Sequence, residues 1–172
     1  CGSAQAGRGT CLRSVVGTCS MANKNKTSDN QDAFLVRQSR SGSKSLVGVF
    51  DGHGAEGRQV ATFTRDHISG SFFSHKSMRT DPVLAFRDAY HDTQRQLERA
   101  TAFDACASGT TAVVAYWRHC HLVVANVGDS RAVLGYDRLP VEGRPSSSAG
   151  LRAMDLTMDH RPDRPDERRR IL

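Results

Sequence analysis

Apolar positions in the middle of the chain recur at helical spacing over two segments. In the first, which follows Glu56, the residues on one face are Val60, Phe63, Thr64, His67 and Ile68. The second begins at Asp81-Pro82, a capping residue followed by a proline at the first helical position. Its face continues towards Thr101 through Val83, Phe86, Tyr90, Thr93 and Leu97. The pattern therefore predicts two amphipathic helices.

Runs of apolar and β-branched residues flank these helices on both sides. Before them, residues 32–37 and 45–50 are joined by the turn-forming segment 39–44, which predicts a β-hairpin. After them, residues 110–116, 121–127 and 131–136 predict three strands of an antiparallel meander. Strands, then helices, then strands is the order of an α+β fold rather than of alternating β-α units.

The remaining segments help to define the domain. We expect residues 1–28 to form an N-terminal arm or edge strand, because they show little apolar periodicity, and residues 140–150 to form a surface loop. Residues 29–172 are then one partial domain, a size that suits a single core. The chain begins at Cys1 and ends in the opening turns of a helix at 165–172, so we expect a fragment of a longer protein.

Composition excludes several classes of protein. No apolar run is long enough to cross a membrane, and the first twenty residues lack a secretory signal. The chain has five cysteines and no C-x-x-C pair, which favours reduced thiols in a cytoplasmic or nuclear setting. His119-Cys120-His121 does not predict a metal site, because neighbouring side chains on a strand point to opposite faces.

The net charge of +6 favours phosphorylated or acidic partners. It does not predict nucleic-acid binding. The arginines of residues 161–170 alternate with acids, as on a solvated helix face, and aromatic residues make up only 6% of the chain.

Candidate chemistry is concentrated where the apolar segment 46–50 runs into Asp51, Gly52 and His53. A carboxylate at a strand end can hold a hard cation, and glycine allows a backbone carbonyl to approach the same cation. The imidazole one residue later can exchange a proton there. Asp32 and Asp129 also fall at strand ends or in the links beside them, so the three acids can converge on Mg²⁺ or Mn²⁺. Each acid can alternatively serve only to cap a turn.

A dinucleotide-binding loop is a second interpretation, because Gly52–Gly57 has the spacing G-x-G-x-x-G after a strand. Asp51 would place a negative charge beside the pyrophosphate. Residues 69–76, where the acid that binds the ribose belongs, contain none. We therefore reject this interpretation.

Five motifs follow one another between positions 30 and 171. They are Asn30-Gln31-Asp32-Ala33-Phe34, Val49-Phe50-Asp51-Gly52-His53-Gly54, Ala107-Ser108-Gly109-Thr110-Thr111-Ala112, Ala125-Asn126-Val127-Gly128-Asp129-Ser130-Arg131-Ala132, and Leu156-Thr157-Met158-Asp159-His160-Arg161-Pro162 with Glu167 to Ile171 behind it. This series resembles the N-terminal portion of the type 2C (PPM-type) family of metal-dependent serine/threonine protein phosphatases. The resemblance implies an α-β-β-α sandwich of two antiparallel sheets flanked by helices, with its C-terminal part missing from this chain.

The resemblance also implies a role for each site residue. Asp51 matches a carboxylate that bridges two Mg²⁺ or Mn²⁺ ions, and Gly52 a residue whose carbonyl binds one of them. Asp32 matches an acid that holds metal-bound water, His53 the general acid for the leaving oxygen, and Asp129 an acid of a third, weaker metal site. The implied reaction is hydrolysis of phosphoserine and phosphothreonine in proteins by a metal-activated water.

The chain departs from the family pattern at three points. Gln31 stands where many members have glutamate, so one ion should bind more weakly. Two later aspartates of the family, which would complete the metal site, would fall beyond Leu172. The family's phosphate-binding arginine has no match, and Lys24 and Lys26 are the nearest cations, with a solvated basic arm as the alternative interpretation.

We therefore expect the complete protein to be a phosphatase acting on phosphorylated proteins, and these 172 residues alone to be inactive. The alternative is a pseudophosphatase, a structural or scaffolding subunit, and either form can be part of a larger assembly. Asp51, His53 and Asp129 together favour the enzyme, because a scaffold needs none of them.

Overall fold

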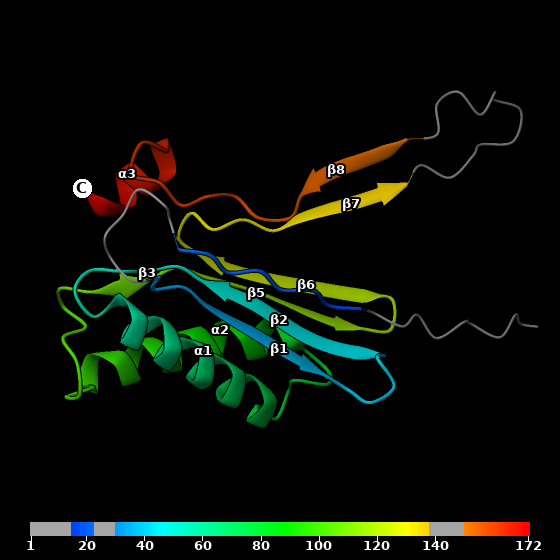
Figure 1. Ribbon diagram of the computed structural model, residues 1–172, viewed down its shortest axis with the longest axis horizontal. Helices are drawn as coiled ribbons and strands as arrows, with labels where there is room; N and C mark the ends of the chain where they lie inside the picture. Colours follow the sequence, from blue (N-terminus) through cyan, green and yellow to red (C-terminus); the bar gives the residue numbers. More distant parts are fainter. Residues whose placement is uncertain (1–14, 23–29, 138–149) are drawn as a thin grey trace, which may run out of the picture.

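The computed structural model describes residues 15–22, 30–137 and 150–172 (Figure 1). The predicted hairpin is present as β1 (Ala33–Gln38) and β2 (Lys44–Phe50). β2 also pairs with β5 (Ala112–Arg118), which pairs with β6 (His121–Val127). The result is an antiparallel sheet with the strand order β1-β2-β5-β6.

Two helices cover one face of this sheet (Figure 1). They are α1 (Gly57–Ser74) and α2 (Pro82–Arg99), which confirm the two predicted helices. α2 starts as predicted, because the Asp81 carboxylate accepts a 2.9 Å hydrogen bond from the Leu84 amide and Pro82 follows the cap. We call β1, β2, β5, β6, α1 and α2 the helix–sheet unit.

Aromatic side chains form the core between the helices and the sheet. Phe72 of α1 stacks on Phe86 of α2 with a ring-centroid distance of 4.3 Å, and it meets the edge of Tyr116 of β5 at 5.0 Å. All three side chains are buried. Two positions predicted on the apolar helix faces are exposed instead: His67 stacks on Phe63 at the margin of α1, and Val83 lies in the first turn of α2.

A separate two-stranded ladder lies next to the end of β2 and the start of β5. β3 (Gly52–His53) pairs with β4 (Gly109–Thr110), so that Gly52 lies opposite Thr110 and His53 opposite Gly109. The predicted strand at 110–116 is therefore divided between β4 and β5. This ladder holds the segment that follows Asp51 against the start of β5.

The chain then leaves the sheet, which contradicts the predicted meander. β7 (Val133–Asp137) does not join β6; within the described residues it pairs only with β8 (Leu151–Asp155), a strand that the sequence pattern did not predict. The chain turns away at Gly128, whose φ of 95° is readily accessible only to glycine. The predicted C-terminal helix is present as α3 (Pro165–Ile171).

We call residues 128–137 and 150–172 the C-terminal arm. Figure 1 shows its ribbon on the side of the sheet opposite the helices. Residues 140–149 of the predicted loop lie outside the described residues. Helices and antiparallel strands together confirm the predicted α+β class. None of the helices in the described ranges combines the length and apolar character needed to cross a membrane.

Candidate metal centre

Two carboxylates lie side by side at the ends of β1 and β2. Ala33 pairs with Phe50, so Asp32 and Asp51 are the next residues on these two adjacent strands. Both line one cavity of about 250 Å³. Partial burial raises the pKa of Asp32, and the charge and hydrogen bond of the Asp51 carboxyl group raise it further. The fold thus brings together two of the three acids that the sequence singled out.

This pair fits a hard divalent cation. Two carboxylates that face one cavity repel each other when both are ionised, and a cation between them removes that repulsion. Mg²⁺ is commonly held by one or two carboxylates while it keeps several waters. Among residues 15–22, 30–137 and 150–172, no three histidine, cysteine, aspartate or glutamate side chains converge as a metal site. The described part of the chain therefore offers a pair of carboxylates to a cation.

A buried threonine fixes the backbone of Asp51. The Thr111 Oγ1 atom accepts a 3.0 Å hydrogen bond from the Asp51 amide, and the Thr111 amide donates to the Asp51 carbonyl at 3.0 Å. The same Oγ1 atom lies 2.6 Å from the hydroxyl of Ser130, which also lines the cavity. Sequence reasoning gave Thr111 no role, although it lies within one of the quoted motifs, because a buried threonine has no periodic signature.

The loop after Asp51 is packed too tightly for any side chain at Gly52. A Cβ atom there would lie 2.4 Å from the Gly57 carbonyl oxygen and 2.6 Å from that of Gln31. Gly54 has a φ of 87°, and its carbonyl accepts a 2.8 Å hydrogen bond from Gln31 Nε2. Gln31 thus ties the loop together through its amide nitrogen. Its predicted role as a metal ligand stays a prediction, as does that of the Gly52 carbonyl.

His53 is exposed and lies over Gly109. A Cβ atom at Gly109 would be 2.7 Å from His53 Cε1 and Nε2, so only glycine leaves room for the ring. His53 lines a different cavity from the acid pair, one of about 730 Å³ between α1, α2 and residues 100–110. The fold therefore places His53 near the acids along the chain but not in their cavity.

Asp129 is separate from the acid pair as well. It follows Gly128 in the link between β6 and β7, and it is exposed. Its Oδ2 atom lies 3.9 Å from Nε of Arg161, a residue of another quoted motif. Its neighbour Ser130, and not Asp129, reaches the cavity of Asp32 and Asp51.

The candidate phosphate contacts Lys24 and Lys26 lie outside the described residues. The described part of the predicted arm does reach the candidate centre: Cys19 and Ser20 line its cavity, and the Ser20 hydroxyl accepts a 2.8 Å hydrogen bond from Asn30 Nδ2. The Cys19 thiol is free and exposed. No sequence pattern predicted this contact, because it joins two segments that lack periodicity.

Comparison with known proteins places the chain in a family. A family model described as protein phosphatase 2C matches residues 14–172. Probable protein phosphatase 2C 52 of Oryza sativa subsp. japonica is 34% identical over 150 residues, covering 86% of this chain and 28% of the relative. Probable protein phosphatase 2C 69 of Arabidopsis thaliana is 37% identical over 126 residues, covering 73% of this chain and 31% of the relative. The chain spans about a third of the length of such relatives.

Solved structures agree in fold. A serine-threonine phosphatase 2C from Toxoplasma gondii superimposes with a TM-score of 0.65 at 22% identity, over 83% of this chain and 49% of that one. A serine/threonine phosphatase from Staphylococcus aureus gives a TM-score of 0.63 at 22% identity, over 90% of this chain and 58% of that one. Together with the family model, these likenesses show that the chain belongs to the protein phosphatase 2C family.

Proposed function

We propose that this chain contributes part of the metal-binding face of a protein serine/threonine phosphatase, one that hydrolyses phosphoserine and phosphothreonine with Mg²⁺ or Mn²⁺. The observation that carries the proposal is the Asp32–Asp51 pair at the ends of adjacent strands, lining one cavity. The family match and the relatives named as probable protein phosphatases support the reaction class.

The site residues have separate roles in this proposal. Asp51 and Asp32 would hold the cation, and Thr111 keeps the Asp51 backbone in register with β5 through paired 3.0 Å hydrogen bonds. The Gly52 carbonyl is a further oxygen donor in this proposal. A bound divalent ion would supply an activated water and neutralise charge on the phosphoryl oxygens.

His53 is the proposed proton donor to the leaving serine or threonine oxygen. Its ring is exposed, so it can exchange protons with solvent, and Gly109 leaves the space that the ring occupies. Lys24 and Lys26 are the proposed contacts for substrate phosphate, as point charges without the bidentate geometry of arginine. Two ions, with a third weak site at Asp129, are the proposed full complement.

The alternative function, a scaffolding pseudophosphatase, has one observation in its favour. Within the described ranges only a pair of carboxylates faces the cavity, and no group of three forms. A single pair gives a weak, water-rich site. For the same reason we propose that the 172 residues alone are inactive.

Phosphate release from a phosphoserine peptide tests whether the protein is an enzyme. It is measured on the protein purified from its native source, with Mn²⁺ and again after chelation. We expect Mn²⁺-dependent phosphate release that falls at least about a thousandfold in Asp51→Asn, the scale of losing a centre that stabilises transition-state charge. Arg99→Gln, on the exposed end of α2, is the matched control and keeps full activity. Phosphate release that survives in Asp51→Asn would contradict the assignment. No release by the native protein would favour the scaffold.

A further inference from the structure

A second cavity lies at the end of the sheet farthest from the acid pair. It has a volume of about 470 Å³ and is formed by the α1–α2 connection and the β5–β6 hairpin. Its polar lining is basic or neutral, with Arg79 and Thr80 from the connection and Arg118, His119 and His121 from the hairpin. No acid is among the described residues that line it. Such a cavity has the charge to receive an anion.

The strand register places three basic residues of the sheet in one row. Lys44 of β2 lies directly opposite Arg118 of β5, and Arg118 lies directly opposite His121 of β6. Residues that are directly opposite in an antiparallel sheet point to the same face. This face is the one covered by the helices, since Tyr116, two residues before Arg118, is buried against Phe72. Lys44 and Arg118 carry like charges in directly opposed positions, which adds to the positive potential beside the cavity, although Lys44 does not line it.

The guanidinium of Arg118 has unused hydrogen-bonding capacity. Its Nη1 atom donates to the Arg79 carbonyl at 2.9 Å, which holds the side chain under the α1–α2 connection. Its Nε atom is buried and has no hydrogen-bond partner in the described structure. Neither Arg79 nor Arg118 forms an ion pair with any described residue. Because this Nε atom is closed off from solvent, an anion in the cavity would meet the exposed Arg79 guanidinium and not Arg118 Nε.

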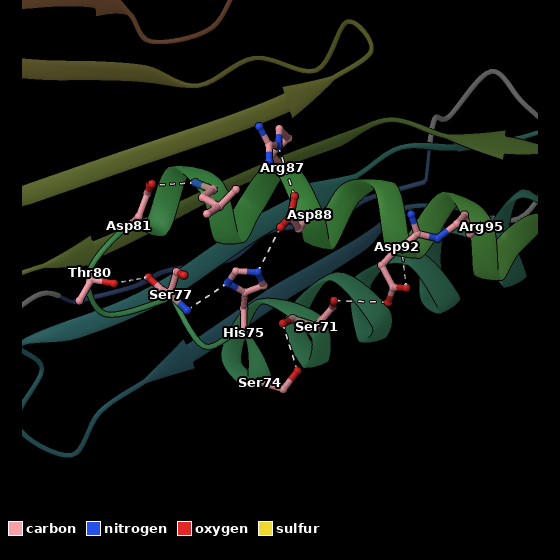
Figure 2. A network of polar contacts seen from close by, with 11 residues as sticks. Ser71, Ser74, His75, Ser77, Thr80, Asp81, Arg87, Asp88, Asp92 and Arg95 are labelled. Atoms are coloured by element: carbon pink, nitrogen blue, oxygen red, sulfur yellow. Dashed lines mark hydrogen bonds and ion pairs between the residues drawn. The ribbon is translucent and has the colours of Figure 1, made fainter.

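The acid that neighbours these residues along the chain, Asp81, already accepts a hydrogen bond. Asp81 adjoins the cavity-lining residues Thr80 and Pro82, but its carboxylate accepts the hydrogen bond from the Leu84 amide at the start of α2. Figure 2 shows Asp81 turned towards this first helical turn, beside Thr80. His75 and Asp88, farther along the same figure, pair with each other at 3.2 Å and do not line the cavity.

The hairpin turn holds a histidine in the left-handed region of backbone conformation. His119 is the first of the two residues that join β5 to β6, and its φ is 53°. Positive φ is uncommon for residues other than glycine, although histidine is one of those that adopt it more often. The backbone is held by a 3.1 Å hydrogen bond from the His119 amide to the Ser43 carbonyl, and by one from Trp117 Nε1 to the His119 carbonyl. His119 and His121 both line the cavity, although Cys120 separates them.

We propose that this cavity is a binding site for a phosphoryl group. Its donors are guanidinium, imidazole and hydroxyl groups that approach from two segments, which suits the several oxygens of a phosphoryl dianion. The group can come from free phosphate or from a phosphorylated side chain of another protein. The site does not depend on the proposed function, because it shares no residue with the candidate metal centre.

Calorimetric titration of the 172-residue chain in EDTA at low ionic strength tests this site apart from any metal. The probes are inorganic phosphate, a phosphoserine peptide of otherwise uncharged residues, and the same peptide without phosphate. We expect one saturable site for a phosphorylated probe, with a Kd at or below about 1 mM. Arg79→Gln should weaken it at least about tenfold, the effect of losing one charge-assisted contact. Arg79 is exposed and its side chain has no partner among the described residues, so this variant should fold.

Arg99→Gln removes the same charge elsewhere and should leave the affinity unchanged, whereas Asp51→Asn should keep phosphoryl binding even if it abolishes metal binding. A phosphopeptide that binds at least tenfold more tightly than phosphate would identify a phosphorylated segment as the source. Equal affinities would identify a small-anion site. Three results would overturn the proposal: no saturation by either phosphorylated probe, equal binding of the peptide without phosphate, or equal weakening by Arg79→Gln and Arg99→Gln.

Discussion

The helix–sheet unit and the C-terminal arm of this protein are held by different kinds of contact. Phe72, Phe86 and Tyr116 are buried against one another in the unit, whereas every described residue of β8 is exposed. The arm is held together by polar contacts within itself. Arg131 makes a bidentate hydrogen bond to Asp159 at 2.9 and 3.0 Å, and Arg164 Nη1 donates to the Asp159 carbonyl at 2.7 Å. Apolar burial resists salt and acid, but such ion pairs do not.

The two regions also differ in what they give to the candidate centre. The unit supplies Asp32 and Asp51 on paired strands, with Thr111 hydrogen-bonded to the backbone of Asp51. The arm supplies Ser130, which reaches the cavity, and Asp129, which does not. The proposed cation site therefore has its carboxylates on the helix–sheet unit, and the arm adds the Ser130 hydroxyl group.

The largest difference should come from truncating the core. Phe72→Ala removes a fully buried aromatic side chain, and we expect it to lower the free energy of unfolding by about 3–5 kcal/mol. Leu151→Ala, at an exposed position of β8, should change it by less than about 0.5 kcal/mol. Urea unfolding measures both variants. Similar losses would mean that the arm has a packed core of its own.

Breaking this ionic contact within the arm should loosen the arm alone. In Arg131→Gln the bidentate contact with Asp159 is lost, so amide hydrogens of β7, β8 and α3 should exchange several-fold faster. Amides of β2 and β5 should keep their protection, because their ladder does not involve Arg131. Salt at about 1 M should have the same effect as the substitution, since the Debye length falls to roughly 3 Å. Faster exchange throughout the sheet would show that the two regions unfold together.

Lowering the pH should also disturb the C-terminal arm before it disturbs the helix–sheet unit. Hydrogen bonds from Arg131 lower the pKa of Asp159 below its usual 3.8. The ionised form is therefore favoured in the folded arm, and its contribution is present above pH 3.8 and lost as the pH falls through the lowered pKa. Amide chemical shifts of the arm, followed by NMR from pH 6 downwards, should change in this acid range ahead of those of β2 and β5. Simultaneous changes in both regions would contradict the comparison.

The smallest expected effect concerns the pair Asp32 and Asp51, where ionisation lowers the stability of the folded state instead of raising it. Because the folded-state pKa of Asp32 is raised, ionisation of this carboxyl opposes folding as the pH rises through that pKa. Asp32→Asn should therefore raise the Tm of the metal-free chain, by on the order of 1–2 °C for a partly exposed pair. The same variant should lose the Tm increase that Mn²⁺ gives the unsubstituted chain. A lower metal-free Tm would show that the two carboxyl groups do not repel each other.

The elements that the sequence predicted correctly are those whose apolar residues repeat periodically and pack against a buried surface. The faces of α1 and α2 and the β1–β2 hairpin were predicted because their apolar residues repeat at the period of their own element. The third predicted strand is present as β7, but its predicted pairing with β6 was wrong, since the turn at Gly128 and β8 decide the pairing. The segment 151–155 is exposed and has no regular alternation.

For the site, the motifs predicted the Asp32–Asp51 pair, and the register of β1 and β2 then explains why the two residues meet. The motifs could not predict that Gln31 points its amide nitrogen at the Gly54 carbonyl. Nor could they show that Arg161 lies beside Asp129, or that His119 and His121 share a cavity. These residues lie in or beside loops and turns, where the spacing along the chain does not indicate in which direction a side chain points.

Binding of Mn²⁺ to the 172-residue chain, followed by the loss of the electron paramagnetic resonance signal of free Mn²⁺, tests the central claim most directly. We predict one ion bound with a Kd on the order of 10⁻⁴ to 10⁻³ M, as for a loosely built oxygen-ligand site. Asp51→Asn should abolish this binding, and Asp129→Asn should leave it within about twofold, because Asp129 does not line the cavity. Binding that persists in Asp51→Asn, or that is lost in Asp129→Asn, would contradict the placement of the metal centre at the ends of β1 and β2.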